Sequence, residues 1–421
     1  MSHMTRPVIR HALTQLRAAV RDTPVVVVTG PRQAGKSTLV RQLIDGGFAA
    51  RYVTLDDSAV RAAAQADPEA FLSDLGSPLV IDEAQRAPAL ALAIKAAVDR
   101  RRTAGRYVLT GSADVTAMLA DALVGRMEAI TLWPLSQGEL EGRRERFVDD
   151  VFAVRLPSAS GSADLRRDAF RRALRGGFPE VALTRAGARR EAWYRSYVAS
   201  VVDREIRDMS RIEELAELPR MLALVAGRAT DALNVSEVAR ALDMNKMTVS
   251  RYLALLERVF LVRRVRSWTG DIGRRVLQHP KLLIPDSGLL GHLLEVDLSR
   301  AMSDGRVGGA IIENFVLGEI ERQLTWSRGR PSLYYLRTYD GHEIDAVLER
   351  RSGELVGIEI KSGLAVDESD FAPLRAFASR VGARFRRGIV LYAGRESVAF
   401  GQKLHALPLS ALWSFTDQSA T

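Results

Sequence analysis

A run of residues near the N-terminus has the types and spacing of a phosphate-binding loop. After the apolar run Val25 to Val28 come, in order, Gly30, Pro31, Arg32, Gln33, Ala34, Gly35, Lys36, Ser37 and Thr38. The two glycines let the backbone turn successive N–H groups toward one anion, at the positive end of the following helix. Lys36 would contact the β- and γ-phosphates and Ser37 a Mg²⁺ ion, so the pattern predicts ATP as ligand. The alternative is a glycine turn before a helix.

A pair of acids after a second apolar run supports this prediction. Asp82 and Glu83 follow Leu79 to Ile81. We assign Asp82 to the magnesium ion and Glu83 to polarising the attacking water. The alternative is a strand that leads into an acidic helix cap.

A third strand, Tyr107 to Leu109, is followed by two hydroxyl residues. In a parallel sheet, ligands lie beyond the carboxyl ends of the strands, so Thr110 or Ser112 would reach the γ-phosphate or the water. Hydroxyl residues in this position also cap helices.

Carboxylates and a lysine gather again near the C-terminus. A hairpin is expected from Tyr334 to Leu348 around the turn Asp340-Gly341, and it places Asp345 on its second strand. Glu359 and Lys361 lie two residues apart on the next strand and share a face. With Glu313 from an upstream helix, 309–323, these carboxylates would hold a divalent metal, and Lys361 would steady a nucleophile against a phosphodiester. The alternative is an exposed ion pair on two strands.

The elements around the loop alternate between strands and helices. The expected strands span 25–29, 51–55, 79–81, 106–109 and 129–132, and the expected helices span 8–20, 36–44, 68–75 and 89–101. Alternation of this kind predicts an α/β fold with a parallel sheet covered by helices on both faces.

The middle of the chain has helical periodicity and a basic surplus. Residues 161–275 contain 23 basic and 15 acidic side chains, a surplus of 8 in a chain whose net charge is +9. Helices are expected at 235–242, capped by Asn234, and at 246–258, followed by a strand at 260–265. This order predicts a winged helix-turn-helix in which Thr248, Ser250 and Arg251 would contact DNA. A solvated helical face, or a module that packs on a neighbouring domain, is the alternative.

Length and composition limit the class of protein. At 421 residues, with the linker-like stretch 156–165, the chain is expected to form three domains, 1–160, 161–275 and 276–421. The absence of cysteine excludes disulfides and thiolate catalysis. With no apolar run of membrane length and no signal peptide, we expect a cytoplasmic protein, beginning at Met4 after cloning residues.

Several motifs together resemble a known family. The segments GPRQAGKST, VIDEAQ, LTGSA, VGR at Arg126 and PLS at 134–136 resemble the AAA+ ATPases of bacteria and archaea that carry a C-terminal domain of unknown function. GGFPE at 176–180, IIENF at 311–315, EIDAVLE and GIEIKSG are similar to that C-terminal domain.

The resemblance covers nearly the whole chain and implies both fold and chemistry. It implies a P-loop AAA-type core, a helical and winged-helix middle, and an ending similar to the PD-(D/E)xK nuclease fold. In that pattern the acids and lysine are Glu313, Asp345, Glu359 and Lys361. Arg126 is similar to the arginine that reaches a nucleotide in cis or in trans, and action in trans requires a homo-oligomer; the alternative is a solvent-facing arginine at a helix end.

Two functions follow from these expectations. The first is an ATP-hydrolysing machine that acts on nucleic acid and cuts or grips DNA with its C-terminal site. The second is a nucleotide-controlled switch or scaffold, in which the winged helix binds DNA or a protein and the C-terminal domain is catalytically silent. A small-molecule kinase is disfavoured, because no acceptor site is apparent.

Overall fold

The computed structural model describes residues 8–159, 164–206, 217–271, 275, 279–338 and 341–416. It divides into two compact units, formed by residues 1–135 with 258–260 and by residues 136–257 with 261–421. The predicted start at Met4, part of the predicted linker (160–163) and Asp340 of the predicted turn lie outside the described residues.

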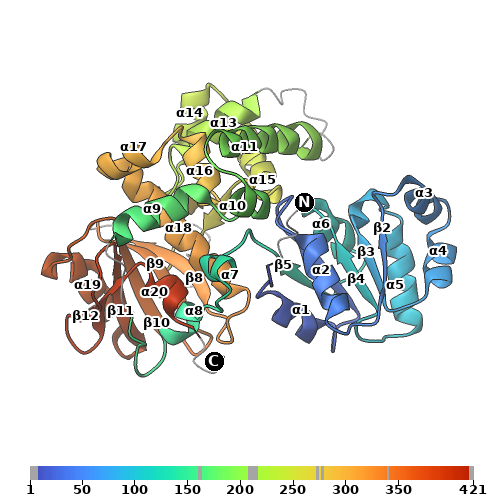
Figure 1. Cartoon of the computed structure of the whole chain (residues 1–421), viewed down its shortest axis with the longest axis horizontal. Helices are drawn as coiled ribbons and strands as arrows, with labels where there is room; N and C mark the ends of the chain where they lie inside the picture. The colour runs from blue at the N-terminus through green and yellow to red at the C-terminus, as the bar shows by residue number, and fades with distance from the viewer. Residues whose placement is uncertain are drawn as a thin grey trace, which may run out of the picture. The chain divides into compact units, whose positions relative to one another are not determined.

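The first unit is a five-stranded parallel sheet with helices on both faces (Figure 1). Its strand order is β2-β3-β4-β1-β5, with bounds Arg51–Thr54 (β2), Leu79–Asp82 (β3), Tyr107–Thr110 (β4), Val25–Thr29 (β1) and Met127–Thr131 (β5). Its helices are α1 (Leu13–Ala19), α2 (Lys36–Asp45), α3 (Ser58–Ala66), α4 (Pro68–Leu75), α5 (Leu90–Arg100) and α6 (Ala113–Ala120), with a short 3-10 turn at Ala84–Arg86. The predicted α/β core and its parallel sheet are confirmed.

Alternating side chains of β1 explain the two covered faces. Val25 and Val27 belong to the core cluster formed with α3 to α6, whereas Val26 and Val28 belong to the cluster formed with α1 and α2. Because successive residues of a strand point to opposite faces, an unbroken apolar run is buried on both sides.

Two details of the first unit differ from the sequence prediction. Helix α1 begins at Leu13 rather than at Val8, because the chain before it turns at Arg10, whose side chain bonds two backbone carbonyls elsewhere in the unit. Helices α3 and α6 were not predicted, although Asp57 caps the first turn of α3.

The second unit combines helices with a six-stranded mixed sheet. The sheet order is β12-β13-β11-β10-β9-β8, with bounds Val398–Ala399, Leu404–Pro408, Phe385–Tyr392, Leu355–Lys361, Glu343–Glu349 and Ser332–Arg337. Helix α19 (Ala372–Val381) packs Leu374 and Phe377 into the core of this sheet, and α18 (Gly305–Leu324) contacts β10. The predicted hairpin and third strand are therefore β8, β9 and β10.

The remaining elements of this unit are mostly helical. They are α7 (Gln137–Glu141), α8 (Phe147–Asp150), α9 (Leu165–Arg175), α10 (Pro179–Thr184), α11 (Ala188–Ser200), a π-helical segment (Val201–Ile206), α13 (Leu218–Ala226), α14 (Val235–Leu242), α15 (Lys246–Arg258), α16 (Ser287–Leu293), α17 (Leu298–Ser303), α20 (Ala411–Ser414), two 3-10 turns (Glu368–Phe371 and Gly382–Arg384) and the two-stranded β6 (Arg263–Val265) and β7 (Lys281–Leu283). The predicted strand at 260–265 is too long at its start, because Phe260 has a φ of 59° and turns the chain after α15.

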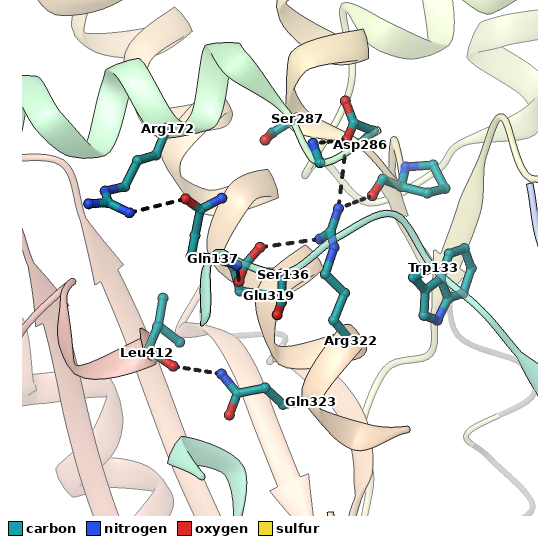
Figure 2. A network of polar contacts seen from close by, with 12 residues as sticks. Trp133, Ser136, Gln137, Arg172, Asp286, Ser287, Glu319, Arg322, Gln323 and Leu412 are labelled. Atoms are coloured by element: carbon teal, nitrogen blue, oxygen red, sulfur yellow. Dashed lines mark hydrogen bonds and ion pairs between the residues drawn. The ribbon is translucent and has the colours of Figure 1, made fainter. Parts of the chain in front are cut away.

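A buried polar network ties α18 to its surroundings within this unit (Figure 2). Glu319 accepts a 2.9 Å hydrogen bond from the backbone N–H of Gln137, and Arg322 lies 3.6 Å from Glu319 and 3.7 Å from Asp286. Asp286 caps α16 and also accepts from Tyr194 at 2.8 Å. Because α18 is apolar or buried over most of its circumference, these polar groups need such internal partners.

Candidate functional site

The turn after β1 has the backbone that an anion cradle requires. Gly30 has a φ of 141°, and a Cβ there would lie 2.2 Å from the carbonyl oxygen of Leu132. Gly35, the first residue before α2, has a φ of 97°. Both conformations favour glycine, so the two predicted glycines are required by the fold of this loop.

Two basic side chains hold the loop. The Nζ of Lys36 donates to the carbonyl oxygens of Gly30 (3.0 Å) and Pro31 (2.9 Å). The buried guanidinium of Arg10 donates to the carbonyl oxygens of Ala34 and Trp133, each at 2.6 Å. Arg10 was missed because nothing in the sequence around it marks a loop contact.

Asp82 is the centre of a hydroxyl cluster. It accepts hydrogen bonds from Ser37 (3.1 Å), Tyr52 (2.7 Å) and Thr110. Burial and the hydrogen bond to Asp82 raise the pKa of Tyr52 to about 12, so its hydroxyl stays a donor at neutral pH. Strand β4 lies between β1 and β3, which is why Thr110 at its end reaches the acid. Tyr52 was not predicted.

Glu83 lies at the edge of this cluster in an unusual backbone conformation. Its φ is 59°, its N–H donates to the Thr110 hydroxyl at 3.4 Å, and its carboxylate accepts from the Gln85 amide at 2.6 Å. Left-handed conformations are uncommon for residues other than glycine and are frequent at functional sites. The side chain of Glu83 therefore has an oriented partner that the sequence did not indicate.

The other predicted nucleotide contacts lie around the same edge. Arg32 is half-buried, whereas Gln33 and Thr38 are exposed. Ser112 is buried at the N-terminus of α6, where its side chain makes no capping bond and its carbonyl oxygen lies 3.5 Å from the Thr29 hydroxyl.

Arg126 lies at the opposite end of the parallel strands from the phosphate loop. Its carbonyl oxygen accepts from the N–H of Val25, at the beginning of β1, whereas the loop follows the end of that strand. Its guanidinium pairs with Asp99 at 2.6 Å. Since β1 is five residues long, roughly 16 Å separate its two ends, and therefore Arg126 from the loop. The structure does not bring Arg126 to the loop of its own subunit, which leaves two alternatives: action in trans, or an arginine without a catalytic role that faces solvent.

Two of the predicted carboxylates of the second unit, Glu313 and Asp345, lie around a lysine that was not predicted, together with Glu343, which was not predicted either. The Nζ of Lys281, on β7, lies 2.6 Å from Glu313, 3.0 Å from Glu343 and 3.6 Å from Asp345. The Lys281 side chain is 0% exposed, and its Nζ lies 5.3 Å from the centre of the Tyr335 ring. We call Lys281, Glu313, Glu343, Asp345 and Glu359 the carboxylate cluster.

Glu359 and Lys361 contribute differently from each other. Glu359 is buried, and its Oε1 has no hydrogen-bond partner among the described residues. Lys361 is 39% exposed and lies 3.5 Å from Asp370. Asp345 also accepts a 2.8 Å hydrogen bond from the N–H of Ile360, which ties β9 to β10.

The charge state of this cluster follows from its burial. Burial raises the pKa of Glu313 to about 8, with the charge of Asp345 adding to the effect and Lys281 opposing it. Burial likewise raises the pKa of Asp345, and it raises that of Glu359 well above its usual range. Burial would lower the pKa of Lys281, but the surrounding carboxylates raise it instead, so the ammonium stays charged.

The two predicted metal sites fit a metal unequally. Ser37 and Asp82 supply a hydroxyl and a carboxylate 3.1 Å apart, which are hard oxygen donors suited to Mg²⁺ beside a triphosphate. In the second unit an ammonium already lies among Glu313, Asp345 and their neighbours. Within the described ranges no group of three or more acids or histidines is arranged to hold a metal ion. Of the predicted metal set, Glu313 and Asp345 are thus found in ion pairs with Lys281, whereas Oε1 of Glu359 lacks a hydrogen-bond partner among the described residues.

The helix pair in the middle of the chain has the predicted bounds. Asn234 caps α14 through the N–H groups of Ser236 and Glu237, as expected. On α15, Ser250 and Arg251 are exposed and Thr248 is half-buried. Two arginines of the following strand are paired with acids, Arg263 with Glu321 at 2.6 Å and Arg264 with Glu257.

Three known families match successive parts of the chain. Residues 22–141 match the family described as AAA domain, residues 166–300 a domain of unknown function (DUF8612), and residues 308–412 a domain of unknown function (DUF4143). The uncharacterized proteins Mb2031c of Mycobacterium bovis and Rv2008c of Mycobacterium tuberculosis are each 34% identical over 355 residues, which is 84% of this chain and 73% of theirs. The chain belongs to the family of these two proteins. Its first unit carries the AAA domain, a P-loop ATPase core.

Solved structures overlap with the chain to a limited extent. The Walker-type ATPase PABY2304 of Pyrococcus abyssi is 15% identical, with 68% of this chain and 98% of that one covered and a TM-score of 0.39. A RuvB variant of Thermotoga maritima is also 15% identical, with 60% and 86% covered and a TM-score of 0.25. In the described part of the chain, no helix combines the length and apolarity needed to cross a bilayer.

Proposed function

We propose that the AAA domain binds ATP with Mg²⁺ at the loop Gly30 to Thr38 and hydrolyses it. The observation that carries this proposal is the 3.1 Å hydrogen bond from the Ser37 hydroxyl to the Asp82 carboxylate, beside a loop in which Gly30 and Gly35 have positive φ. The match to the AAA domain family over residues 22–141 supports it.

Different groups in and around the loop have different roles in binding ATP and Mg²⁺. Backbone N–H groups of the loop and the N-terminus of α2 attract the phosphates, and Lys36 adds an ammonium beside them. Arg10 keeps the loop in place through the carbonyl of Ala34. When bound by Ser37 and Asp82, Mg²⁺ would neutralise charge on the phosphates.

Glu83 is the residue that we propose to polarise the attacking water. Its carboxylate is oriented by Gln85 at 2.6 Å, and Thr110 links its N–H to Asp82. Ser112 lies at the end of the neighbouring strand and is the proposed contact to the γ-phosphate. These roles separate binding, which depends on Lys36, from hydrolysis, which depends on Glu83.

For the second unit we propose a catalytically silent domain under the control of the nucleotide state. Of the two functions that the sequence left open, the nuclease needs a metal among Glu313, Asp345 and Glu359. The buried ammonium of Lys281 disfavours that arrangement, because Glu313 and Asp345 already have a cation partner. The chain is then an ATP-driven switch or scaffold in the cytoplasm, and its partner binds elsewhere.

Helices α14 and α15 are our candidate for the partner surface. We propose that they form a winged helix with β6 and β7 and that exposed Arg251 and Ser250 contact DNA. The basic surplus of 8 in residues 161–275 supports this proposal. The ion pairs of Arg263 and Arg264 favour α15 over β6 as the contact element.

The test is ATP binding and ATP turnover in the full chain, with and without single-stranded and duplex DNA. We expect Glu83→Gln to bind ATP and to lose turnover, whereas Lys36→Ala loses both. Glu69→Gln and Arg100→Ala, at one exposed ion pair, are the matched controls. Wild-type turnover in Glu83→Gln would contradict the assignment of the base. DNA stimulation that is lost in Arg251→Ala would support the winged helix, and unchanged stimulation would contradict it.

A second assay addresses the silent domain. Supercoiled, linear and branched DNA are incubated with the full chain and Mg²⁺ or Mn²⁺. We expect no nicking, and Lys361→Ala should behave as wild type. Cleavage that disappears in Asp345→Ala would overturn the proposal and restore the nuclease.

A further inference from the structure

We propose that Lys281 is the resident cation of the carboxylate cluster: it fills the place of a divalent metal, and its loss alone turns the cluster into a divalent-cation site. This inference rests on the silent C-terminal domain of the proposed function and not on ATP hydrolysis.

The geometry supplies one cation to several acids from separate elements. Lys281 comes from β7, Glu313 from α18, and Glu343 and Asp345 from β9. The Nζ lies within 3.6 Å of an oxygen of each acid. An ammonium and a divalent ion compete for such oxygens, since hard divalent ions are bound by carboxylates.

Lys281 is held in place by more than its charge. Its backbone pairs with Val265 of β6 and forms a bridge to Ala232. The Tyr335 ring lies beside its Nζ, and the hydroxyl of Tyr335 donates to the carbonyl oxygen of His279 near the start of the same strand. A fully buried lysine fixed in this way cannot turn away to admit a metal, unlike Lys361, which is 39% exposed.

An unsatisfied oxygen shows that the cluster has capacity for a ligand. Glu359 is 5% exposed, and its Oε1 lacks a hydrogen-bond partner within the described part of the chain. Glu359 and Asp345 occupy the next positions after the pair Ile358 and Ala346 on the neighbouring strands β10 and β9, and Asp345 accepts a hydrogen bond from the N–H of Ile360, so the two carboxylates are neighbours. Buried polar atoms are nearly always satisfied, so this oxygen indicates a place where one more cation contact would be favourable.

The experiment compares metal binding in nucleotide-free full-length wild type, Lys281→Ala and Lys361→Ala. Tb³⁺ is the probe, because a lanthanide near Nζ of Lys281 would be sensitised by the Tyr335 ring, which lies 5.3 Å from that atom. Mn²⁺ is the second probe, and its effect on the melting temperature is measured. Omitting nucleotide leaves the phosphate loop without the ligand that would recruit a metal there.

We expect sensitised Tb³⁺ emission and an Mn²⁺-dependent rise in melting temperature only in Lys281→Ala. Adding Asp345→Asn to that variant should weaken the affinity for Mn²⁺ by at least about tenfold, because loss of even an outer-shell partner of a metal ligand costs about that much. Emission from wild type that is lost in Glu313→Gln would overturn the proposal. A folded Lys281→Ala that binds neither ion would also overturn it.

A variant that does not fold is covered by a second design. If Lys281→Ala is unfolded, recovery of its structure by Mn²⁺ supports the proposal. If it stays unfolded with Mn²⁺, Lys281→Ala/Glu343→Gln replaces it, because Glu343 is the most exposed of the three paired acids and its loss reduces repulsion. Binding of Tb³⁺ and Mn²⁺ by this folded double variant would then support the proposal, and binding of neither ion would overturn it.

Discussion

The phosphate loop and the carboxylate cluster each contain a lysine, and the two lysines have different partners. Lys36 donates to carbonyl oxygens of the loop to which it belongs, five and six residues away in the chain. Lys281 meets carboxylates of α18 and β9, which lie far from it in the sequence. The first lysine is part of a contiguous motif, and the second is recognised only after folding.

The phosphate loop is a contiguous sequence motif, whereas the carboxylate cluster is assembled from distant residues by folding. A contiguous loop brings its own chemistry, because neighbouring residues cannot move apart. The carboxylate cluster consists of residues that are distant in the sequence, so its composition depends on how the elements pack. Here packing places the ammonium of Lys281 among acids that the sequence had suggested as metal ligands. The following predictions test the contrast, from the largest expected effect to the smallest.

Lys281→Ala should lower the free energy of unfolding by about 3–5 kcal/mol, because it leaves buried carboxylates without a cation. Lys361→Ala, at an ion pair with a 39% exposed lysine, should cost about 0–1 kcal/mol. Denaturant unfolding of both variants measures the difference. Equal losses would remove the distinction between the two lysines.

Lys36→Ala should reduce ATP turnover about 10²–10³-fold, the usual effect of losing a charge-stabilising donor. Its stability should change less than that of Lys281→Ala, since the bonds of Lys36 that stabilise the loop go to neutral carbonyls. Steady-state kinetics and denaturant unfolding on one preparation compare the two. A large loss of stability with little loss of turnover would reverse the contrast.

Arg126→Ala should lose at least about tenfold in turnover if it acts in trans. Mixing it with Lys36→Ala should restore part of the rate, because an intact loop on one subunit then meets an intact arginine on another. Turnover of each variant and of the mixture is measured at equal total protein. Wild-type rates in Arg126→Ala would assign its role to the ion pair with Asp99.

Glu319→Gln should change how stability depends on pH. Burial raises the pKa of Glu319 to about 7 from an ordinary value of 4.5, so the folded state keeps a proton that the unfolded chain releases. Wild-type stability should therefore fall as pH rises through this window, by at most about 1.4 kcal/mol per pH unit from this group.

The glutamine variant cannot titrate and should lack that part of the slope. It keeps an oxygen for the N–H of Gln137. Unfolding curves from pH 4 to 8, with Glu69→Gln as exposed control, provide the measurement. Parallel curves for Glu319→Gln and wild type would contradict the prediction.

Tyr52→Phe should have the smallest effect, a reduction in turnover of a few-fold. It removes one of the hydroxyls that orient Asp82, and one hydrogen bond of this kind contributes about 1 kcal/mol. Thr110→Val, which removes another, is the comparison. No change in either variant would show that Ser37 suffices to hold Asp82.

Much of the fold could be predicted from local patterns. The strands β1 to β5, the bounds of α14 and α15, and the hairpin of β8 and β9 follow from apolar periodicity, caps and turn residues that lie within a few positions of one another. Helix α3 was missed because its single buried residue, Ala64, provides almost no apolar face. Phe260 was assigned to a strand because its φ of 59° is not encoded by its residue type.

By itself the sequence determined the phosphate loop, since Gly30, Gly35, Lys36 and Ser37 are positioned by the short chain that joins them. The tertiary structure decided the strand order, which brings Tyr52 and Thr110 to Asp82. It likewise placed Arg126 at the end of the strands opposite to the loop. It also decided that Lys281 is buried among Glu313, Glu343 and Asp345. The physical reason is the same in each case: a charge acts over a few ångströms of space, and only folding sets which distant residues come within that range.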